Sequence, residues 1–486
     1  SLATYDPETL ELRGLLAEAW QLDPDGLWLR AKIRDEAVFS DGHPVLAEDV
    51  KFTFDDIVFN AELQTERFRS TMNVIERVDI IDDRTVEFVF KESTFTNLRV
   101  ALRELNVLPK HVYEQFTPSQ LNQSTGLLMG SGPYRLATFN PDNPFVGQWA
   151  PPQDIVLVRN ENYWGQRPPI DTFRYKTITG YSQILTSIRN GTGDLARGTP
   201  EQFTTVSRDT DFLEEFTPME WPNMRSGFSF LAWNCGDRNG KPTPFVDKRV
   251  RRAMTHLIDR ERVIRDFLYG MGEIATSPFP YGSKQVSPDI EPWAYDIEEA
   301  KRLLDEAGWI DRNGDGWREN EEGDRFSFKY THSQGSTTSK RVGDYLKRQC
   351  LAVGVDVELV SIEWAIFAQV LDNRDFDVIT MQWSQSHPES DPYQLWHSAS
   401  ILNQGDNFSQ WSNAEADRLI ELGRRTIDED ERMKVWHELH RVLHEEQPYT
   451  FMVNPPWIRF ARQNIGNLNK YNIGLNKFET FVAEPF

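Results

Sequence analysis

The sequence predicts a mixed α/β (α+β) fold that contains several sheets. Segments that alternate apolar and polar residues, which is typical of strands, are interspersed with segments whose apolar residues recur every three or four positions, which is typical of helices. This pattern runs along all 486 residues, a length that suggests roughly three domains at about 150 residues each. With 39% hydrophobic and 12% aromatic residues, the chain can build the cores that such domains need.

The first 130 residues predict strands, a turn and a helix. Apolar and polar residues alternate over 27–34, which predicts a half-buried strand. A turn at 41–44 leads into a helix over 47–57, whose first turn carries the acidic residues that a helix N-terminus favours. A second strand follows at 85–90, and the Gly/Ser/Pro cluster at 130–133 marks a domain boundary.

Strands and helices continue to alternate beyond this boundary. Two helices have clear N-caps, Asp247 and Asp296, and the second also has a stop signal at Gly308. Less complete patterns predict a strand at 155–158, a helix around 184–188, a strand at 355–359, a helix from about 365 and a strand over 376–381. Because the sequence contains no low-complexity linker, we expect short segments of chain to connect the domains.

Composition limits the partners of this chain. Its 53 basic and 75 acidic residues give a net charge of −22, and such a surface repels nucleic acid phosphates and anionic lipid head groups. No apolar run approaches the ~18 residues that a membrane helix needs, so we expect no transmembrane segment. Two cysteines, Cys235 and Cys350, cannot build a disulfide framework, and the sequence leaves open whether they pair.

The clearest local motif is an acidic loop that fits the pattern of a calcium-binding loop. It follows D-x-[DN]-x-[DN]-G-x5-E, in which oxygen atoms surround one Ca²⁺ ion. The predicted ligands are Asp311, Asn313, Asp315, the carbonyl group of Trp317 and the carboxylate of Glu322. The alternative is a solvated acidic turn that needs no metal. We expect a structural Ca²⁺ ion here and no organic cofactor.

Three histidines near the C-terminus could form a second metal site. His437, His440 and His444 share one face of a predicted helix, and imidazoles in that arrangement can bind a transition metal. No HExxH motif is present and no acidic ligand is fixed nearby. The favoured interpretation is therefore a stripe of solvent-facing histidines.

No motif predicts an enzyme. The sequence contains no GxSxG elbow and no Walker A loop, and neither cysteine lies in a recognisable nucleophile motif. The segment 270–275 imitates a dinucleotide-binding loop, but it follows a helical pattern where that fingerprint needs a strand, which favours a simple turn. We therefore expect no enzymatic activity.

Tryptophans in polar loops are the best candidates for a binding site. Of the 15 Trp residues, Trp221, Trp364, Trp383 and Trp396 lie in or beside loops rich in Asn, Gln, Ser and Asp. Such indoles can stack on an organic ligand in a concave pocket, although each single one is more typical of packing. The cluster around Trp383 is the strongest candidate, because too many polar residues surround it for an ordinary core strand.

Ordered segments across nearly the whole chain resemble the family 5 extracellular solute-binding proteins, the peptide and nickel receptors of ABC importers. The segments are LLAEAWQLDPDGLWLRAKIRDEAVFSDGHPVLAEDVKFTFD, GSGPYRL, IVLVRNENYWG, IRNGTGDLA, PFVDKRVRRAMTHLIDRERVI and YDIEEAKRLLDEAGW. Their number, order and spacing make the resemblance far more specific than a single short motif.

The resemblance implies a two-lobed fold of the periplasmic-binding-protein type II kind, with an extra small domain and lobes that close by a hinge motion. Residues 1–20, 130–221 and 449–486 would form lobe I, residues 21–129 an accessory domain packed on it, and residues 222–448 lobe II. A small organic ligand would lie in the cleft between the lobes, and the receptor would present it to an ABC permease.

The resemblance also implies a monomer that works in the periplasm or outside the cell. Family members normally carry an export signal and a further segment before the motif that begins at Tyr5 here. We therefore expect the chain to be incomplete at its N-terminus, where the missing segment could also carry a lipid anchor.

The ligand is expected to be peptide-like. Peptide receptors of the family place an aspartate three residues after the tryptophan equivalent to Trp383, where it pairs with the α-amino group of the peptide. Here that position is Ser386, and the nearest carboxylates are Glu389 and Asp391. One possibility is that the loop shifts so that Asp391 pairs with the α-amino group. The other, which we favour, is that the ligand has no ammonium group at this position. The predicted ligand-binding residues are Trp221, Asn223, Trp364, Trp383, Ser386, Asp391 and Trp396.

Two kinds of alternative remain from the sequence. The same family includes receptors for nickel, so a metal chelate or an oligosaccharide could replace the peptide. A hydrolase on the same scaffold is the alternative from a different class, and it would need a reactive group in the cleft that the sequence does not supply.

Overall fold

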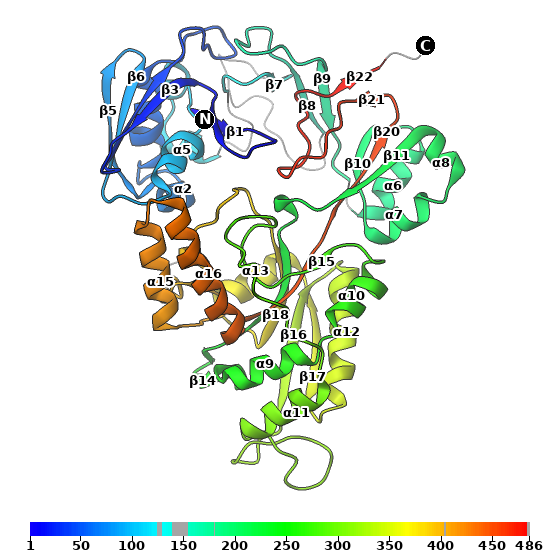
Figure 1. The fold of residues 1–486 in the computed structure, drawn as a ribbon. Helices are drawn as coiled ribbons and strands as arrows, with labels where there is room; N and C mark the ends of the chain where they lie inside the picture. The colour runs from blue at the N-terminus through cyan, green and yellow to red at the C-terminus, as the bar shows by residue number, and fades with distance from the viewer. Residues whose placement is uncertain (124–128, 139–153, 179, 403–404, 484–486) are drawn as a thin grey trace.

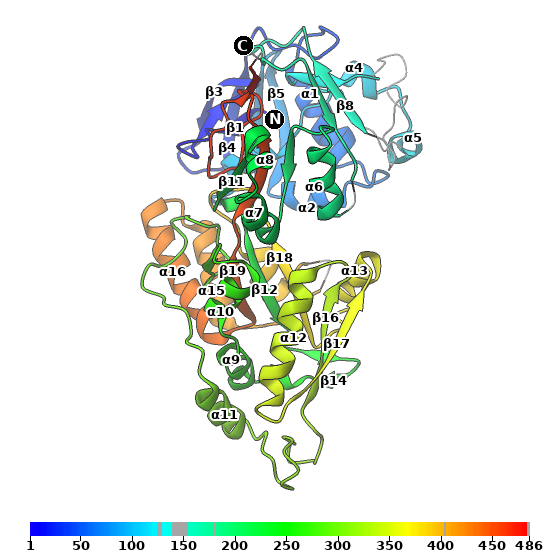
Figure 2. The same cartoon turned by 90° about the vertical axis from the view of Figure 1, so that its right-hand side faces the viewer.

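The structure is a computed structural model that describes residues 1–123, 129–138, 154–178, 180–402 and 405–483. Figures 1 and 2 show two lobes, one above the other, joined by extended segments. The N-terminus and the last described residues, 481–483, lie in the upper lobe (Figure 1). Residues 124–128 of the predicted accessory domain and residues 139–153 of predicted lobe I lie outside the described residues.

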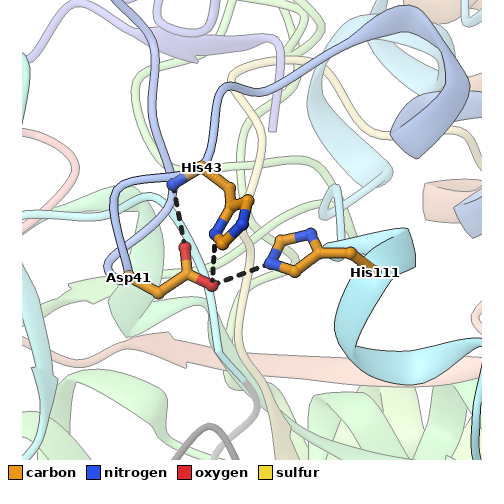
Figure 3. Close-up of side chains that lie close together, drawn as sticks. All are labelled: Asp41, His43 and His111. Atoms are coloured by element: carbon orange, nitrogen blue, oxygen red, sulfur yellow. Dashed lines mark hydrogen bonds and ion pairs between the residues drawn. The ribbon is translucent and has the colours of Figure 1, made fainter.

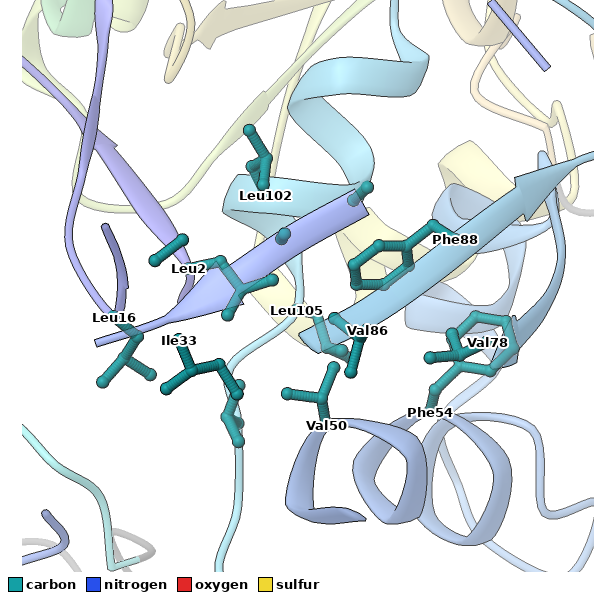
Figure 4. Packing of buried hydrophobic residues seen from close by; sticks show 14 of the residues in the cluster. Leu2, Leu16, Ile33, Val50, Phe54, Val78, Val86, Phe88, Leu102 and Leu105 are labelled. Atoms are coloured by element: carbon teal, nitrogen blue, oxygen red, sulfur yellow. The ribbon is translucent and has the colours of Figure 1, made fainter. Parts of the chain in front are cut away.

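The N-terminal part of the upper lobe is built on a four-stranded antiparallel sheet with the order β3-β4-β6-β5. Its elements are β3 (Ala17–Leu22), β4 (Trp28–Ile33), β5 (Ile75–Asp82) and β6 (Thr85–Phe90), with helix α1 (Ala47–Phe52) on one face. Buried and exposed side chains alternate along β4, so the sheet has one apolar face. Val50 and Phe54 meet Val78, Val86 and Phe88 in the core beneath that face (Figure 4).

The upper lobe also contains a hairpin, two three-stranded sheets and the paired short strands β21 (Ile465–Gly466) and β22 (Phe481–Val482). The hairpin pairs β1 (Ala3–Tyr5) with β2 (Leu12–Gly14). The first sheet has the order β7-β8-β9, formed by β7 (Tyr134–Leu136), β8 (Ile155–Arg159) and β9 (Thr172–Tyr175). The second has the order β10-β20-β11, formed by β10 (Leu195–Arg197), β11 (Phe216–Trp221) and β20 (Trp457–Arg462), with α6 (Tyr181–Arg189), α7 (Pro200–Val206) and α8 (Thr210–Glu215) beside it.

A six-stranded mixed sheet with the order β15-β19-β12-β18-β16-β17 forms the centre of the lower lobe. Its strands are β12 (Phe228–Trp233), β15 (Glu273–Ile274), β16 (Ser327–Ser333), β17 (Asp356–Ile362), β18 (Val378–Trp383) and β19 (Tyr449–Asn454). Leu231 and Trp233 of β12 belong to one core, whereas Phe230 and Ala232 belong to another. Since successive side chains of a strand point to opposite faces, this sheet is buried on both sides.

Two groups of helices cover the faces of this sheet. Their cores identify the groups: α9 (Lys248–His256), α10 (Arg260–Phe267), α11 (Ile297–Glu306) and α12 (Thr337–Leu351) on one face, and α13 (Trp364–Asp372), α14 (Tyr393–Trp396), α15 (Ala414–Arg425) and α16 (Glu429–Glu446) on the other. Helix α16 also reaches the upper lobe, because Trp436 packs edge-on against Phe95 at 5.8 Å between ring centroids.

In the described part of the chain, the backbone crosses between the lobes twice, from β11 to β12 and from β19 to β20. At the last register position of the upper sheet, Trp221 of β11 lies opposite Trp457 of β20, so the two crossings are adjacent. The predicted boundary at residue 449 is too early, because residues 449–454 form β19 in the sheet of the lower lobe. Two adjacent crossings between packed lobes are the usual basis of a hinge motion.

Most of the predicted elements are present. The strand predicted at 85–90 is β6 with the same bounds, and Asp247 and Asp296 cap α9 and α11 as expected. The helix predicted over 47–57 starts as α1 but continues as a π-helix, Thr53–Val58. The other short elements are α2 (Glu66–Met72), α3 (Asn97–Arg99), a π-helix (Val100–Glu104), α4 (Lys110–Tyr113), α5 (Pro118–Gln123), β13 (Asp237–Arg238), β14 (Lys241–Pro242), β21 (Ile465–Gly466) and β22 (Phe481–Val482).

The two cysteines do not pair. Cys235 and Cys350 are free thiols, and burial raises the pKa of Cys235 to about 11 and that of Cys350 further. Neither thiol is therefore a reactive thiolate at neutral pH.

Among the described residues, no helix combines the length and the apolar character that crossing a membrane requires.

Candidate functional site

A cavity of about 520 Å³ lies between the two lobes, within the usual range of ~300–1,000 Å³ for ligand pockets. Residues from both lobes line it. Tyr5, Leu10, Phe95 and Arg99 come from the upper lobe, and Tyr281, Lys284, Glu389 and Met433 from the lower lobe. Met224, which lies in the first crossing between β11 and β12, and Asn472 also contribute. The wall combines apolar surface with a few charged groups, as expected of a pocket for an organic ligand.

An ion pair fixes the lower wall of the cavity. The carboxylate of Glu389 accepts hydrogen bonds from Nε and Nη2 of Arg432 at 2.7 and 3.0 Å and from Nε1 of Trp436 at 2.9 Å. The Nη1 group of Arg99, in the upper lobe, donates to the backbone carbonyl of Glu389 at 2.9 Å. This segment is therefore held from both lobes.

A histidine beside the cavity connects the lobes without carrying charge. Nδ1 of His387 lies 3.2 Å from the hydroxyl of Tyr5, and its Nε2 lies 3.1 Å from a carboxylate oxygen of Glu104. Burial, together with the nearby guanidinium groups of Arg99, Arg103 and Arg225, lowers the pKa of His387 to about 3. The imidazole is therefore neutral at physiological pH.

Two of the predicted ligand-binding residues, Trp221 and Asn223, stabilise the first crossing between the lobes. Trp221 is buried, donates from Nε1 to the carbonyl of Tyr471 at 3.0 Å, and packs edge-on against Trp457. The Oδ1 atom of Asn223 accepts from the backbone N–H of Ser226 at 3.2 Å. Neither residue is among those that line the cavity.

The other predicted residues divide between core and surface. Trp396 is fully buried against Tyr449, and Trp383 lies between Phe230 and Phe408. Trp364 is 59% exposed on α13, and Ser386 is exposed too. Asp391 makes an ion pair with Arg424 at 3.1 Å and accepts from the backbone N–H of Tyr393. None of these residues is among those that line the cavity either, although Asp391 lies two positions from Glu389.

The sequence did not identify the residues that line the cavity. They come from segments around residues 5–12, 95–99, 280–285 and 388–389, which only the tertiary structure brings together. One signal was available: Phe95 and Tyr281 stand in short polar stretches, as the selected tryptophans do.

The acidic loop gathers three carboxylates, and two of them, Asp311 and Asp315, belong to the predicted set. Asp311, Asp315 and Glu319 each place one oxygen within 4.8 Å of the others. Asn313 uses its side-chain oxygen to accept from the backbone N–H of Asp315 at 2.8 Å. Glu322 is exposed and is not part of this group. The loop therefore presents Glu319 where the sequence pattern suggested Glu322.

The prediction of solvent-facing histidines on α16 is wrong for two of the three. His440 and His444 are buried, and burial lowers the pKa of each to about 4. His440 uses Nδ1 to accept from the backbone N–H of Ser287, and its Nε2 lies 3.1 Å from the carbonyl of Thr276. These contacts fix the histidine as a neutral core residue, because the loop that follows β15 covers this side of α16.

Comparisons with known proteins agree with this architecture. The family model of the bacterial extracellular solute-binding proteins, family 5 Middle, matches residues 11–403. The oligopeptide-binding protein AppA of Bacillus subtilis is 29% identical over 463 residues, which cover 94% of this chain and 80% of AppA. The dipeptide-binding protein of Escherichia coli is 22% identical, over 99% of this chain and 88% of that protein.

Solved structures show the same fold. The structure of Bacillus subtilis AppA in complex with a nonapeptide matches with a TM-score of 0.84 and 27% identity, covering 99% of this chain and 92% of that one. NikA from Brucella suis in complex with Fe(III)-EDTA matches with a TM-score of 0.80 and 21% identity, covering 99% and 93%.

Two lobes, two adjacent crossings and a cavity lined from both sides define a solute-binding receptor. The family model spans most of the chain. The chain belongs to the bacterial extracellular solute-binding proteins of family 5, which are receptors and not enzymes.

Proposed function

We propose that this chain captures a peptide in the cavity between its lobes and presents it to the permease of an ABC importer. The cavity itself carries the proposal, because both lobes line it and a ligand there would hold them together. The relationship to the Bacillus subtilis oligopeptide-binding protein, whose structure contains a nonapeptide, favours a peptide over other ligands.

The carboxylates near the cavity favour a ligand whose α-ammonium group is not bound at this loop. Asp391 is already paired with Arg424, and Glu389 with Arg432. Ser386 carries no charge. Since both acids already have a cationic partner, we favour the hypothesis that the ligand has no ammonium group at this position.

We also propose a monomeric receptor located in the periplasm or outside the cell. The family is extracellular, and a lipid anchor in an upstream segment would be compatible with this location. For the domains, we propose lobe I from residues 1–20, 130–221 and 455–486, with the accessory domain at 21–129. Lobe II would then span 222–454, which places β19 with the sheet that it joins.

The test is a thermal-shift and calorimetric screen of the purified chain against peptides of two to nine residues, a nickel–histidine chelate and oligosaccharides. We expect peptides to raise Tm, since a ligand at 100 times its Kd stabilises the folded state by about 2.7 kcal/mol. Tyr281→Ala, in the cavity wall, should weaken binding about tenfold. Tyr295→Ala, which removes an exposed tyrosine outside the wall, should leave it unchanged. A response to chelates or sugars alone would contradict the peptide assignment.

We further propose that the acidic loop holds a structural Ca²⁺ ion. Three converging carboxylates repel one another unless a cation lies between them. A calcium chelator should therefore lower Tm by several degrees, and Asp315→Asn should remove this response. Glu322→Gln is the matched control, since Glu322 lies outside the carboxylate group, and it should keep the response. An unchanged Tm after chelation would leave the loop as a simple turn.

A further inference from the structure

Two histidines and an aspartate meet on the surface of the upper lobe, away from the cavity. Asp41 and His43 belong to the turn that precedes α1, and His111 lies on α4. The Oδ2 atom of Asp41 is 2.7 Å from Nε2 of His111 and 3.2 Å from Nδ1 of His43. Both imidazole rings point toward this one oxygen (Figure 3), and their centroids are 4.1 Å apart.

The backbone holds these three side chains in place. The turn is closed by hydrogen bonds between Phe39 and His43 and from the Gly42 N–H to the Phe39 carbonyl. Asn162 donates from Nδ2 to the carbonyl of Ser40 at 3.0 Å, which pins the turn from outside. Helix α4 is fixed at its start by a hydrogen bond from the Lys110 N–H to Asp49. The positions of the three side chains are therefore set before any ion binds.

The carboxylate is oriented as well as positioned. Its Oδ1 atom accepts from the backbone N–H of His43 at 3.1 Å, which leaves Oδ2 to face the two rings. An aspartate carboxylate is ionised at neutral pH, so Asp41 can serve as an anionic ligand.

We infer that Asp41, His43 and His111 bind a divalent transition-metal ion of the Zn²⁺ type. Two imidazole nitrogens and one carboxylate oxygen suit Zn²⁺ and its neighbours better than Ca²⁺ or Mg²⁺, which prefer oxygen ligands. At bond lengths of about 2.0–2.1 Å, two ligands of a tetrahedral ion lie roughly 3.3 Å apart. The distance between His43 and Asp41 already matches this value, and the distance between His111 and Asp41 needs to open by about half an ångström.

The site is accessible and leaves room for further ligands. The side chain of His43 is 62% exposed and that of His111 is 35% exposed, whereas that of Asp41 is 13% exposed. An ion can therefore enter from solvent and complete its coordination with water. To coordinate an ion, each imidazole would use the tautomer that carries its hydrogen on the nitrogen facing away from Asp41.

The test uses the untagged full chain in chelator-free buffer, titrated with Zn²⁺ by calorimetry. We expect saturable binding at one site. His43→Ala and His111→Ala should each weaken this binding at least tenfold, and because His43 is largely exposed, its removal should not disturb the fold. Co²⁺ is the second probe: its visible ligand-field absorption should appear with the wild-type chain and disappear with His43→Ala.

His437→Ala is the matched control. His437 is a partly exposed histidine on α16, outside this group, and its removal should change the Zn²⁺ affinity by less than twofold. Two results would overturn the inference: no saturable Zn²⁺ binding by the wild-type chain, or equal Zn²⁺ binding by the wild-type chain and the His43→Ala variant. In either case the three residues would form only a hydrogen-bonded cluster that stabilises the turn against α4.

Discussion

Gly227→Ala is expected to prevent stable folding. Gly227 ends the first crossing with φ 62° and ψ −143°, a region that only glycine adopts without strain. A Cβ atom there would lie 1.5 Å from the backbone carbonyl oxygen of Trp383, far inside any contact distance. Because a backbone atom of the neighbouring strand cannot move aside without breaking the pairing of β12 and β18, we expect a loss above ~4 kcal/mol.

Gly240→Ala is the control that measures the cost of backbone strain alone, without the steric clash expected at Gly227. Gly240 also has positive φ, at 77°, but nothing lies within 4 Å of its Cβ position. It should therefore cost only about 1 kcal/mol, visible as a small decrease in Tm. Soluble expression, circular dichroism and thermal unfolding of the two variants make the comparison. A Gly227→Ala protein that unfolds within a few degrees of Gly240→Ala would show that the crossing can relax around the new methyl group.

The parts of the fold that the sequence predicts are those that depend on nearest neighbours along the chain. The alternating pattern of β4 and the N-caps Asp247 and Asp296 are local signals, and the structure has each of them. The order of the six strands in the lower lobe is not local, because β19, from near the end of the chain, inserts between β15 and β12. This long-range pairing is also the reason that the predicted boundary at 449 was misplaced.

Candidate site residues were harder to predict because composition does not distinguish a pocket from a core. The polar surroundings of Trp383 and Trp396 in the sequence predict ligand contacts, yet Trp396 is completely buried and Trp383 packs between two phenylalanines. The same difficulty affected His440, whose burial depends on the distant residues Thr276 and Ser287. Helical spacing places the three histidines on one face of the helix, but it does not show which other residues cover that face.

Glu389→Gln is expected to lower the free energy of unfolding by about 3–5 kcal/mol, because it leaves a buried cation without its partner. Arg432 is only 7% exposed. Its charged guanidinium donates two short hydrogen bonds to the Glu389 carboxylate in a bidentate arrangement. Arg432 also donates to the carbonyls of Thr426 and Ile427 and lies over the ring of Phe95 at 4.9 Å. None of these partners carries a negative charge that could replace the carboxylate. Chemical denaturation monitored by Trp fluorescence gives the measurement.

Glu431→Gln is the matched control on α16, the helix that carries Arg432. Glu431 pairs with Lys434 at 2.6 Å, but both side chains are more than 60% exposed, so this change should cost no more than about 0.5 kcal/mol. If Glu389→Gln costs as little as Glu431→Gln, water must reach Arg432. The double variant Glu389→Gln/Arg432→Met should recover part of the loss, since no unpaired charge remains buried. Glu389 also lines the cavity, so the double variant need not recover peptide binding when it recovers stability. Measuring both the free energy of unfolding and the peptide affinity would therefore separate the role of this ion pair in stability from its role in shaping the pocket wall.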